Sequence, residues 1–283
     1  MAPEHTAVDT RVGPFTTLLT PDGYNPKTDK GHARGFVTAV LYLAPSDASG
    51  VLNVCQFASP GCRASCLYRA GRAAFDVEIP AARINRTKLF RYNRFSFNAR
   101  LVKEIASHVR RAARKGMRPA VRLNGTSDLP WEAYRLNDGR TALETFPDVQ
   151  FYDYTKNVRR ALANAAGEHP ANYHLTFSRA ETNEPDCVRV LNAGGSVAVV
   201  FNARTKSGKR AADPLPAYWH GYRVIDADTD DLRFLDDPNV IAGLRAKGPA
   251  KLDRTGFVAD VNSDACSSTD PSVDCTTVHA WAA

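Results

Sequence analysis

The sequence lacks any long apolar run, and its beginning lacks a secretory signal. No stretch approaches the roughly 18 consecutive apolar residues that would suggest a membrane span. Residues 1–6 do not contain the basic and apolar regions that a signal peptide requires. We therefore predict a cytoplasmic protein, a setting in which structural disulfides are rare and clustered cysteines more often bind metal.

The sequence also has no internal repeat and no recognisable motif for binding DNA or RNA. Its 283 residues are enough for one large domain or two small ones. Hydrophobic residues at 43% and charged residues at 24% are ordinary for a soluble globular protein. Composition alone therefore predicts a folded soluble protein and does not indicate its function.

The net charge of +7 is unevenly distributed along the chain. Residues 81–122 contain thirteen Lys or Arg and a single acid, Glu104, so this segment carries +12 and the remainder about −5. Such a basic segment, counted from Arg83 to Arg122, suits an anionic partner such as nucleic acid or a phosphorylated small molecule. A solvated helical face explains the same charges equally well, and both interpretations stay open.

Short apolar segments alternate with helical segments along most of the chain. The first strand is predicted at residues 36–44, where β-branched and aromatic residues are dense. Strands that alternate with helices indicate βαβ units, so we predict an α/β fold with a mainly parallel sheet, a TIM-like partial or full barrel. The other predicted strands are residues 120–124, 149–154, 173–177, 197–201, 222–225 and 239–243, and the predicted helices are residues 80–94, 98–115, 141–145, 158–166 and 184–193.

The predicted domain organisation follows from this alternation. The barrel-like domain is expected to span residues 36–258, after an N-terminal arm of residues 1–35 that shows little periodicity. Residues 259–283 are rich in Ser, Asp and Thr and are expected to form a C-terminal extension. The extension carries Cys266 and Cys275, to which we assign no ligand role.

Three of the six cysteines lie within twelve residues of one another, directly after the first predicted strand. Cys55, Cys62 and Cys66 are on a loop that contains the turn-forming run Ser59-Pro60-Gly61. A loop after the first strand lies at the carboxyl end of a parallel sheet, where α/β proteins place their sites. Three thiolates at that position predict an iron–sulfur cluster.

Three kinds of site compete for this loop. Structural zinc typically uses two short Cys-x2-4-Cys pairs, but here the spacings are six and three residues and no second pair follows. A catalytic thiol needs one activated cysteine, which leaves the other two unexplained. A four-iron cluster on three cysteines leaves one iron open to a cofactor or substrate, and we predict a [4Fe-4S] cluster of this kind. Cys187 is the best candidate for a fourth protein ligand, although such a cysteine more often serves as a buried small hydrophobic side chain.

Polar residues follow several predicted strands at the same carboxyl edge. Good turn formers end strands without any function, which explains part of this pattern. Charged residues such as Lys156 are less well explained in this way, so we predict that the strand ends line a pocket for a cofactor or substrate. The predicted lining residues are Asn124, Ser127, Asp128, Lys156 and Ser178.

Two family resemblances rest on these motifs. The three-cysteine loop that leads into a parallel sheet resembles the radical S-adenosylmethionine enzymes, although the cysteine spacing here is longer. That resemblance implies a [4Fe-4S] cluster with S-adenosylmethionine on the fourth iron. The chain more specifically resembles a phage family called gene product 88, whose members have no known reaction, and a phage-encoded protein would act in the host cytoplasm. The matching stretches lie between about residues 36 and 258, at residues 53–71, 122–131, 151–156, 173–179 and 197–201.

The sequence leaves three functions open. The preferred hypothesis is an iron–sulfur enzyme that uses S-adenosylmethionine and acts on a nucleotide or nucleic acid, with the cofactor supplying the chemistry. A non-catalytic iron–sulfur protein, with a structural or redox-sensing cluster, is the first alternative. A module that binds nucleic acid through its basic face, with zinc on the cysteines, is the second.

Overall fold

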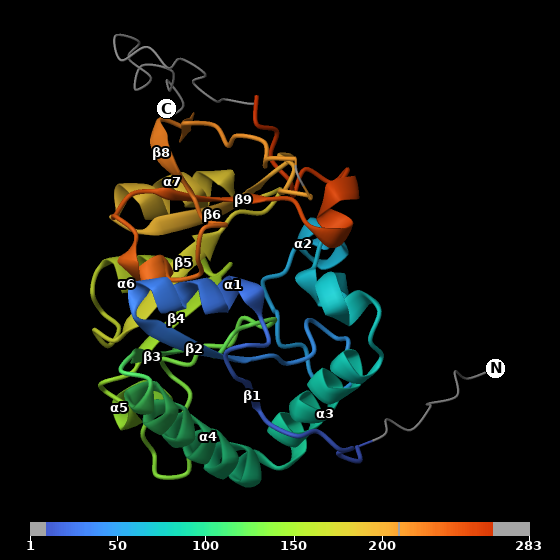
Figure 1. Ribbon diagram of the computed structural model, residues 1–283, viewed down its shortest axis with the longest axis vertical. Coiled ribbons are helices and arrows are strands. Elements are labelled where there is room, and N and C mark those ends of the chain that lie inside the picture. The colour runs from blue at the N-terminus through green and yellow to red at the C-terminus, as the bar shows by residue number, and fades with distance from the viewer. Residues whose placement is uncertain (1–9, 209, 263–283) are drawn as a thin grey trace, which may run out of the picture.

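The structure of the protein is a computed structural model that describes residues 10–208 and 210–262. A nine-stranded mixed sheet forms its centre, with the strand order β1-β2-β3-β4-β5-β6-β9-β8-β7 (Figure 1). The seven strands from β2 to β8 in this order are parallel, and β1 and β7 pair antiparallel at its two ends. The predicted α/β fold with a mainly parallel sheet is confirmed.

The predicted strands correspond to seven of the observed ones, with boundaries that differ by a few residues. The strands are β1 (Leu19–Thr20), β2 (Phe36–Leu41), β3 (Arg118–Arg122), β4 (Gln150–Thr155), β5 (Tyr173–Ser178), β6 (Ser196–Phe201), β7 (Tyr218–Trp219), β8 (Tyr222–Asp226) and β9 (Ile241–Arg245). The α-helices are α1 (Pro26–Asp29), α2 (Pro60–Ala64), α3 (Glu78–Tyr92), α4 (Arg94–Arg114), α5 (Ala142–Thr145), α6 (Val158–Ala165) and α7 (Glu184–Asn192). Short 3-10 turns complete the described fold.

Local sequence explains where the structure departs from the predicted elements. Strand β1 and helix α1 lie within the segment predicted as an arm, and Asn25 caps α1 by accepting the N–H of Lys27 at 3.0 Å. The two basic helices were predicted to be separated by residues 95–97. In the structure only Asn93 lies between them. Its side chain accepts the N–H of Ser96 at 3.0 Å, so α4 begins directly after α3 ends.

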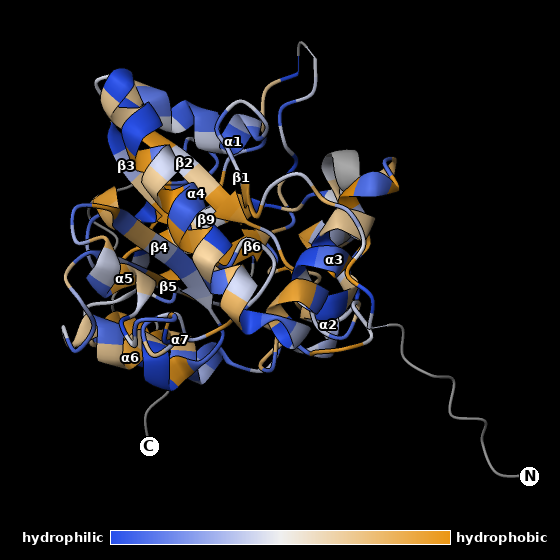
Figure 2. Ribbon diagram, turned by 90° about the horizontal axis from the view of Figure 1, so that it is seen from below, coloured by the Kyte–Doolittle hydropathy of each residue, from blue (hydrophilic) through white to orange (hydrophobic). Residues whose placement is uncertain are grey.

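One face of the sheet is covered by helices and carries most of the hydrophobic core. Helices α4, α6 and α7 pack against β3, β5 and β6 on this outer face. In Figure 2 the strands are largely hydrophobic, whereas the helices show hydrophilic residues toward the outside. Two large apolar clusters fill the space between them, around Phe151 and Trp131 on one side and Phe177 and Phe201 on the other.

The inner face of the sheet is closed by the segment that follows β8. Strand register places Tyr152 beside His174 and Ala198 beside Ala242 on this face, because side chains alternate between the two sides of a strand. Leu232 packs against Tyr152 here. The carboxylate of Asp231, on the same segment, accepts hydrogen bonds from Tyr152 and Arg122 and pairs with Lys27.

In six of the seven parallel strands, all except β8, the last side chain on the inner face is partly exposed, whereas the residues before and after it in the chain are buried. Because those neighbours face the helices, the exposure lies on the inner face at the carboxyl edge of the sheet. We call this set the inner rim. It consists of Tyr42, Arg122, Tyr154, Ser178, Val200 and Leu244.

Candidate functional site at the carboxyl edge of the sheet

The cysteine loop follows β2 and contains the short helix α2. Ser59 caps this helix by accepting the N–H of Cys62 at 3.1 Å, and Pro60 occupies its first position, where no N–H is needed. The sulfur of Cys66 accepts the N–H of Tyr68 at 3.5 Å, at the start of the next 3-10 turn. Local turn chemistry thus places Cys62 within α2 and Cys66 just after it.

Residues from other strands hold the loop at the edge of the sheet. Glu181, which follows β5, accepts hydrogen bonds from the Ser59 hydroxyl at 2.6 Å and from the Gly61 N–H at 2.7 Å. The N–H of Asp128, which follows β3, donates to the carbonyl of Val54 at 2.8 Å. Only glycine suits position 61, because a Cβ there would lie 2.7 Å from Oε2 of Glu181. The loop is therefore fixed to the ends of two strands distant in sequence.

The fold brings the three cysteines into electrostatic range of one another. Burial raises the pKa of Cys55 to about 12, and the neighbouring thiols of Cys66 and Cys62 add to the rise. Burial also raises the pKa of Cys62, against the opposing charge of Lys156. The sulfur of Cys55 donates to the carbonyl of Thr126 at 3.6 Å. Metal-free thiols in this setting stay protonated at neutral pH, so thiolates form here only when a cation compensates their charge.

The arrangement of the cysteines bears on which metal suits them. Within the described residues, no group of three His, Cys, Asp or Glu side chains is arranged to hold a single metal ion. Tetrahedral zinc, with Zn–S bonds of about 2.3 Å, requires sulfur atoms about 4 Å apart. In a four-iron cluster each cysteine binds a different iron, so its sulfur atoms are further apart. The described side chains therefore form no preformed single-ion site, and the iron–sulfur cluster stays a prediction.

Lys156 lies at this site, at the carboxyl end of β4. Its ammonium donates to the carbonyls of Ser178 at 3.3 Å and Arg179 at 3.0 Å, and it lies 5.1 Å from the ring centre of Phe257. Burial lowers the pKa of Lys156, and the nearby Cys62 opposes that change. The ammonium of a half-buried lysine near a cysteine is one of the settings that favour a thiolate.

Arg83 approaches the site from α3 on the other side. Its guanidinium lies between two aromatic rings, 4.9 Å from the ring centre of Tyr42 and 5.3 Å from that of Tyr68. Only 9% of Arg83 is exposed, and its Nη1 has no hydrogen-bond partner. Burial lowers the pKa of Arg83, while Cys66 is near enough to oppose the change.

A family model described as "Gene product 88" matches residues 17–261 of the chain. The chain belongs to the gene product 88 family. No curated protein and no solved structure matches it. The family resemblance predicted from the motifs is thereby confirmed, whereas the comparisons show no relation to radical S-adenosylmethionine enzymes, and that resemblance stays a prediction. None of the helices in the described residues is long and apolar enough to cross a membrane.

The predicted lining residues of this gene product 88 protein take different positions. Asp128, Lys156 and Ser178 lie together next to the cysteine loop. Asp128 accepts the N–H of Lys156 at 2.8 Å and forms an ion pair of 2.6 Å with Arg160, so its carboxylate already has partners. Ser178 belongs to the inner rim, and its carbonyl accepts from Lys156. These three residues form the part of the predicted pocket that the fold assembles near the cysteines.

Asn124 and Ser127 instead build the turn after β3. The side-chain oxygen of Asn124 accepts hydrogen bonds from the Ser127 hydroxyl at 2.8 Å, the Leu129 N–H at 2.9 Å and the Trp131 indole at 3.1 Å. Both side chains are buried. Three donors use the full capacity of this oxygen in the turn itself, so the geometry gives Asn124 a structural role.

Among the described residues, the cysteine outside the loop is Cys187. Cys187 is fully buried on α7 and packs in the apolar cluster with Phe177 and Val197. Burial raises its pKa to about 12. This is the setting of a small hydrophobic side chain, in accord with the interpretation preferred from the sequence. Cys266 and Cys275 lie outside the described residues.

Three further residues of this edge, Arg83, Tyr42 and Tyr154, were not among those predicted from the sequence. One available signal was the charge of Arg122 inside an apolar strand, since a charged residue there indicates a special environment. Every second side chain of a strand faces the same side of the sheet. The residues that face the same side as Arg122 in the neighbouring strands therefore identify the inner rim. Arg83 gave no such signal, because on a basic helix it resembles any surface arginine.

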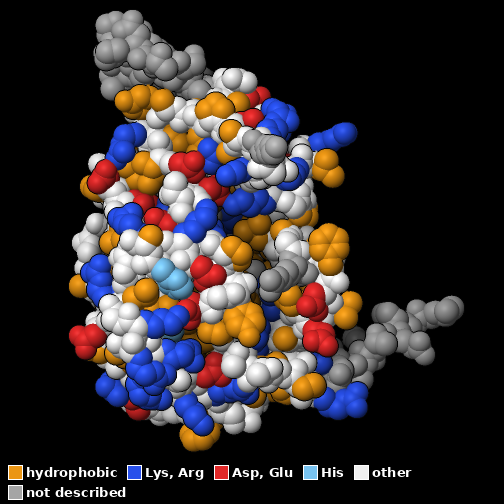
Figure 3. Space-filling model, in the orientation of Figure 1, with side chains coloured by type: hydrophobic (Ala, Val, Ile, Leu, Met, Phe, Trp, Pro, Cys, Tyr) orange, Lys and Arg blue, Asp and Glu red, His pale blue; other side chains and the backbone are white. Residues whose placement is uncertain are grey.

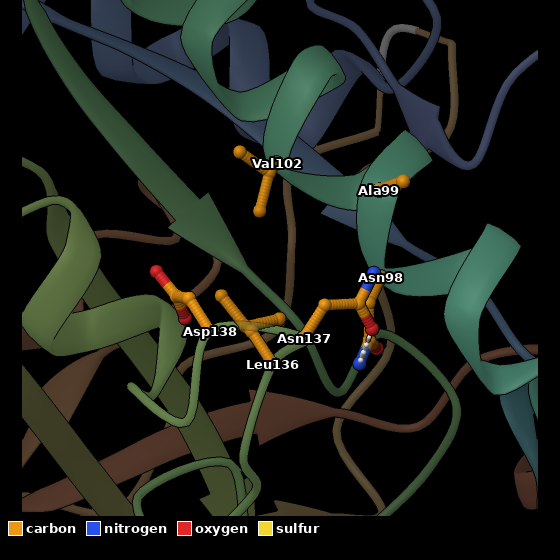
Figure 4. Close-up of a pocket in the computed structure, with 6 residues that line it drawn as sticks. All are labelled: Asn98, Ala99, Val102, Leu136, Asn137 and Asp138. Atoms are coloured by element: carbon orange, nitrogen blue, oxygen red, sulfur yellow. Dashed lines mark hydrogen bonds between the residues drawn. The ribbon is translucent and has the colours of Figure 1, made fainter.

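A surface depression is lined by residues that do not include the cysteines. It has a volume of about 220 Å³ and lies between the N-terminal part of α4 and the loop before α5 (Figure 4). Its only charged residue, Asp138, pairs with Arg140 at 2.8 Å. The lining residues are Asn98, Ala99, Val102, Leu136, Asn137 and Asp138. Without a nucleophile or a free titratable group, this depression does not compete with the cysteine site.

Proposed function

We propose that Cys55, Cys62 and Cys66 bind a [4Fe-4S] cluster that leaves one iron without a protein ligand. The observation that carries the proposal is the assembly of these thiols at the carboxyl edge of a parallel sheet. The loop that bears them is tied to the ends of β3 and β5 through Asp128 and Glu181. This edge is where open α/β sheets and barrels place their cofactors.

The inner rim supports an enzymatic role for the cluster. Its polar residues Tyr154 and Ser178 lie on the same edge as the cysteine loop, and the buried hydroxyl of Tyr154 has no hydrogen-bond partner. We infer that S-adenosylmethionine or another small molecule binds between the inner rim and the open iron, beside Lys156. The cluster would supply an electron to that molecule, and the protein would supply its orientation. A cluster that served only structure would not require a buried hydroxyl without a partner at this position.

Iron and sulfide content tests the cluster. Protein purified without oxygen should contain about four iron and four sulfide ions per chain and absorb visible light. Protein with neither ion, or with a single zinc ion, would refute the proposal.

The open iron is tested by adding S-adenosylmethionine to the dithionite-reduced protein. We expect the electron paramagnetic resonance spectrum of the cluster to change, because one iron gains a ligand while the other three keep their cysteines. Adenosine, which lacks the amino acid part, serves as the control and should leave the spectrum unchanged. A spectrum that does not respond to S-adenosylmethionine would favour the structural or redox-sensing alternative.

A second proposal concerns the basic segment. Some of its basic residues lie in the interior of the fold and others lie on the surface. Arg83 and Arg122 face the interior, and Arg100 pairs with Glu104 at 2.9 Å. Other basic residues remain on the surface, and Lys and Arg side chains gather over α4 in the lower left of Figure 3. Exposed members on this helix include Lys103, Arg110 and Arg114, and Arg94 is exposed at its start. We propose that this face of α4 binds the phosphates of a nucleic acid.

Salt dependence tests the α4 face. We expect single-stranded RNA or DNA to bind with an affinity that falls steeply with salt, measured by fluorescence anisotropy. Replacing Arg110 and Arg114 with glutamine should reduce the slope of log K against log[salt] by about two, because two phosphate contacts are lost. Arg159→Gln, an exposed arginine on α6, is the matched control. An equal loss in the control would mean that net charge, and not this face, is responsible.

A further inference from the structure

Exposed aromatic side chains lie at the corner where helix α3 ends and helix α4 begins. Phe95, in the first turn of α4, is 72% exposed, and Tyr92, the last residue of α3, is 42% exposed. Two neighbouring phenylalanines, Phe90 and Phe97, are instead buried and pack edge to face with ring centres 5.0 Å apart. Other rings therefore fill the core at this corner, and the ring of Phe95 is left to contact a partner outside the chain.

The first turn of α4 is fixed in place by the loop before α5. The side-chain amide of Asn137, on that loop, donates to the carbonyl of Phe95 at 3.0 Å and accepts from the amide of Asn98 at 3.0 Å. Asn93 caps the helix by accepting the N–H of Ser96 at 3.0 Å. Because these contacts already order the backbone of Phe95, a partner that stacks on its ring costs little conformational entropy.

The surface depression described above lies one turn further along α4. Its volume is about 220 Å³, and Ala99 and Val102 on the helix lie across it from Leu136 on the loop (Figure 4). The two amides among its lining residues bond to one another, and Asp138 is paired with Arg140 at 2.8 Å. The depression therefore offers apolar surface to a flat ring and little that would distinguish the edge of one base from another.

The exposed ring and the depression lie on the same side of α4 as its exposed cations. Members of this side recur at intervals of four or seven residues, the spacing of neighbours on one face of a helix. They are Phe95, Ala99, Lys103, Arg110 and Arg114. Glu104, the only acid of this helix, pairs with Arg100 at 2.9 Å and accepts two backbone N–H groups next to and within β1. This side of α4 thus combines an aromatic ring, an apolar surface and three positive charges.

We infer that this surface binds a single strand of nucleic acid, with one base stacked on Phe95, the next base over the depression, and the following phosphates on Lys103, Arg110 and Arg114. This inference rests on the proposed nucleic-acid binding by α4 and adds the form of the strand. Aromatic rings combined with a line of positive charge are the means by which proteins bind single strands without reading their sequence. A duplex presents its phosphates to such a surface, but its bases are stacked on one another and leave Phe95 without a partner.

The test is fluorescence anisotropy with a labelled single strand of oligothymidine over a series of salt concentrations. Phe95→Ala should weaken binding about tenfold, because one stacked base is lost. It should leave the slope of log K against log[salt] unchanged, because no phosphate contact is lost. Phe95→Trp should keep the affinity, whereas Phe95→Leu, which is apolar but not aromatic, should lose as much as the alanine variant. Phe75→Ala, at a phenylalanine that is 92% exposed and precedes α3, is the matched control and should bind like wild type.

Two further measurements separate the parts of the inference. The duplex of the same strand with oligodeoxyadenosine should bind more weakly than the single strand at equal salt. Ala99→Gln, which fills the depression without a change of charge, should weaken binding of the single strand severalfold, and an unchanged affinity would overturn the part assigned to the depression.

Equal affinity for duplex and single strand, or an unchanged affinity in Phe95→Ala, would overturn the inference while the phosphate-binding role of α4 survives. Equal losses in Phe95→Ala and Phe75→Ala would overturn it as well, because exposed apolar surface in general, and not this ring, would then be responsible. Wild-type protein that binds neither form would instead refute the proposed nucleic-acid binding itself, so the two failures are distinguishable.

Discussion

Changing Cys62 to alanine is expected to abolish the iron and sulfide content of the anaerobically purified protein, from about four of each per chain to nearly none. Cys62 lies in the middle of the three-cysteine loop, and its neighbour Lys156 is placed to stabilise its thiolate. With one of three thiolates removed, two protein ligands cannot hold four irons. The same result is expected for Cys55→Ala and Cys66→Ala.

Cys187→Ala is the matched control for these changes. Its thiol is buried in the apolar cluster on α7, so the variant should keep its iron and sulfide. Circular dichroism at low temperature would show whether each variant is folded. If Cys187→Ala lost as much iron as Cys62→Ala while remaining folded, the fourth iron would have a protein ligand and the open-iron proposal would fall.

Asp231→Asn is expected to lower the free energy of unfolding by about 3–5 kcal/mol, the usual cost of removing one partner from a buried charge network. Asp231 is 2% exposed, and its carboxylate contacts Lys27 at 3.1 Å and Arg122 at 3.2 Å. Tyr152 donates a third contact at 3.1 Å. An amide of the same shape leaves two cations without their anion on the inner face. Urea unfolding followed by tryptophan fluorescence would measure the difference.

The pH dependence of this effect follows from the pKa of Asp231. Burial opposes ionisation, but the charges of Lys27 and Arg122 outweigh it and lower the pKa from 3.8 to about 2. The stabilisation is therefore complete above about pH 4 and is lost as the pH falls toward 2, so wild type and variant should converge there. Asp237→Asn, at an exposed pair with Arg223, is the control and should cost less than about 1 kcal/mol. Equal costs at the two positions would contradict the network described for the inner face.

The three-cysteine loop could be placed from the sequence because local rules determine it. Residues 36–41 are apolar and β-branched, as expected of a strand covered on both sides. A loop that follows such a strand must emerge at the carboxyl edge of the sheet. Ser59 and Pro60 also behave as their sequence positions predict, since helix caps depend on residues only a few positions apart.

The roles of Asn124 and of the inner rim could not be predicted from local sequence rules. An asparagine after a strand has the same pattern whether it binds a ligand or closes a turn, and its partner Trp131 identifies the turn. Strand β2 is buried at every position, so its alternation is invisible in the hydrophobic pattern. Only the pairing of β2 with β3, through Val40 and Arg122, shows which side chains face inward.

The sequence by itself determined most of the longer strands and helices of this protein, and that three cysteines share one loop at the edge of a parallel sheet. It also determined the concentration of positive charge between Arg83 and Arg122. Only the tertiary structure decided that Arg83 is buried between Tyr42 and Tyr68 while Arg110 and Arg114 face solvent. The physical reason is that charge is a property of the residue, whereas burial and counter-charge depend on segments that meet only when the chain is folded.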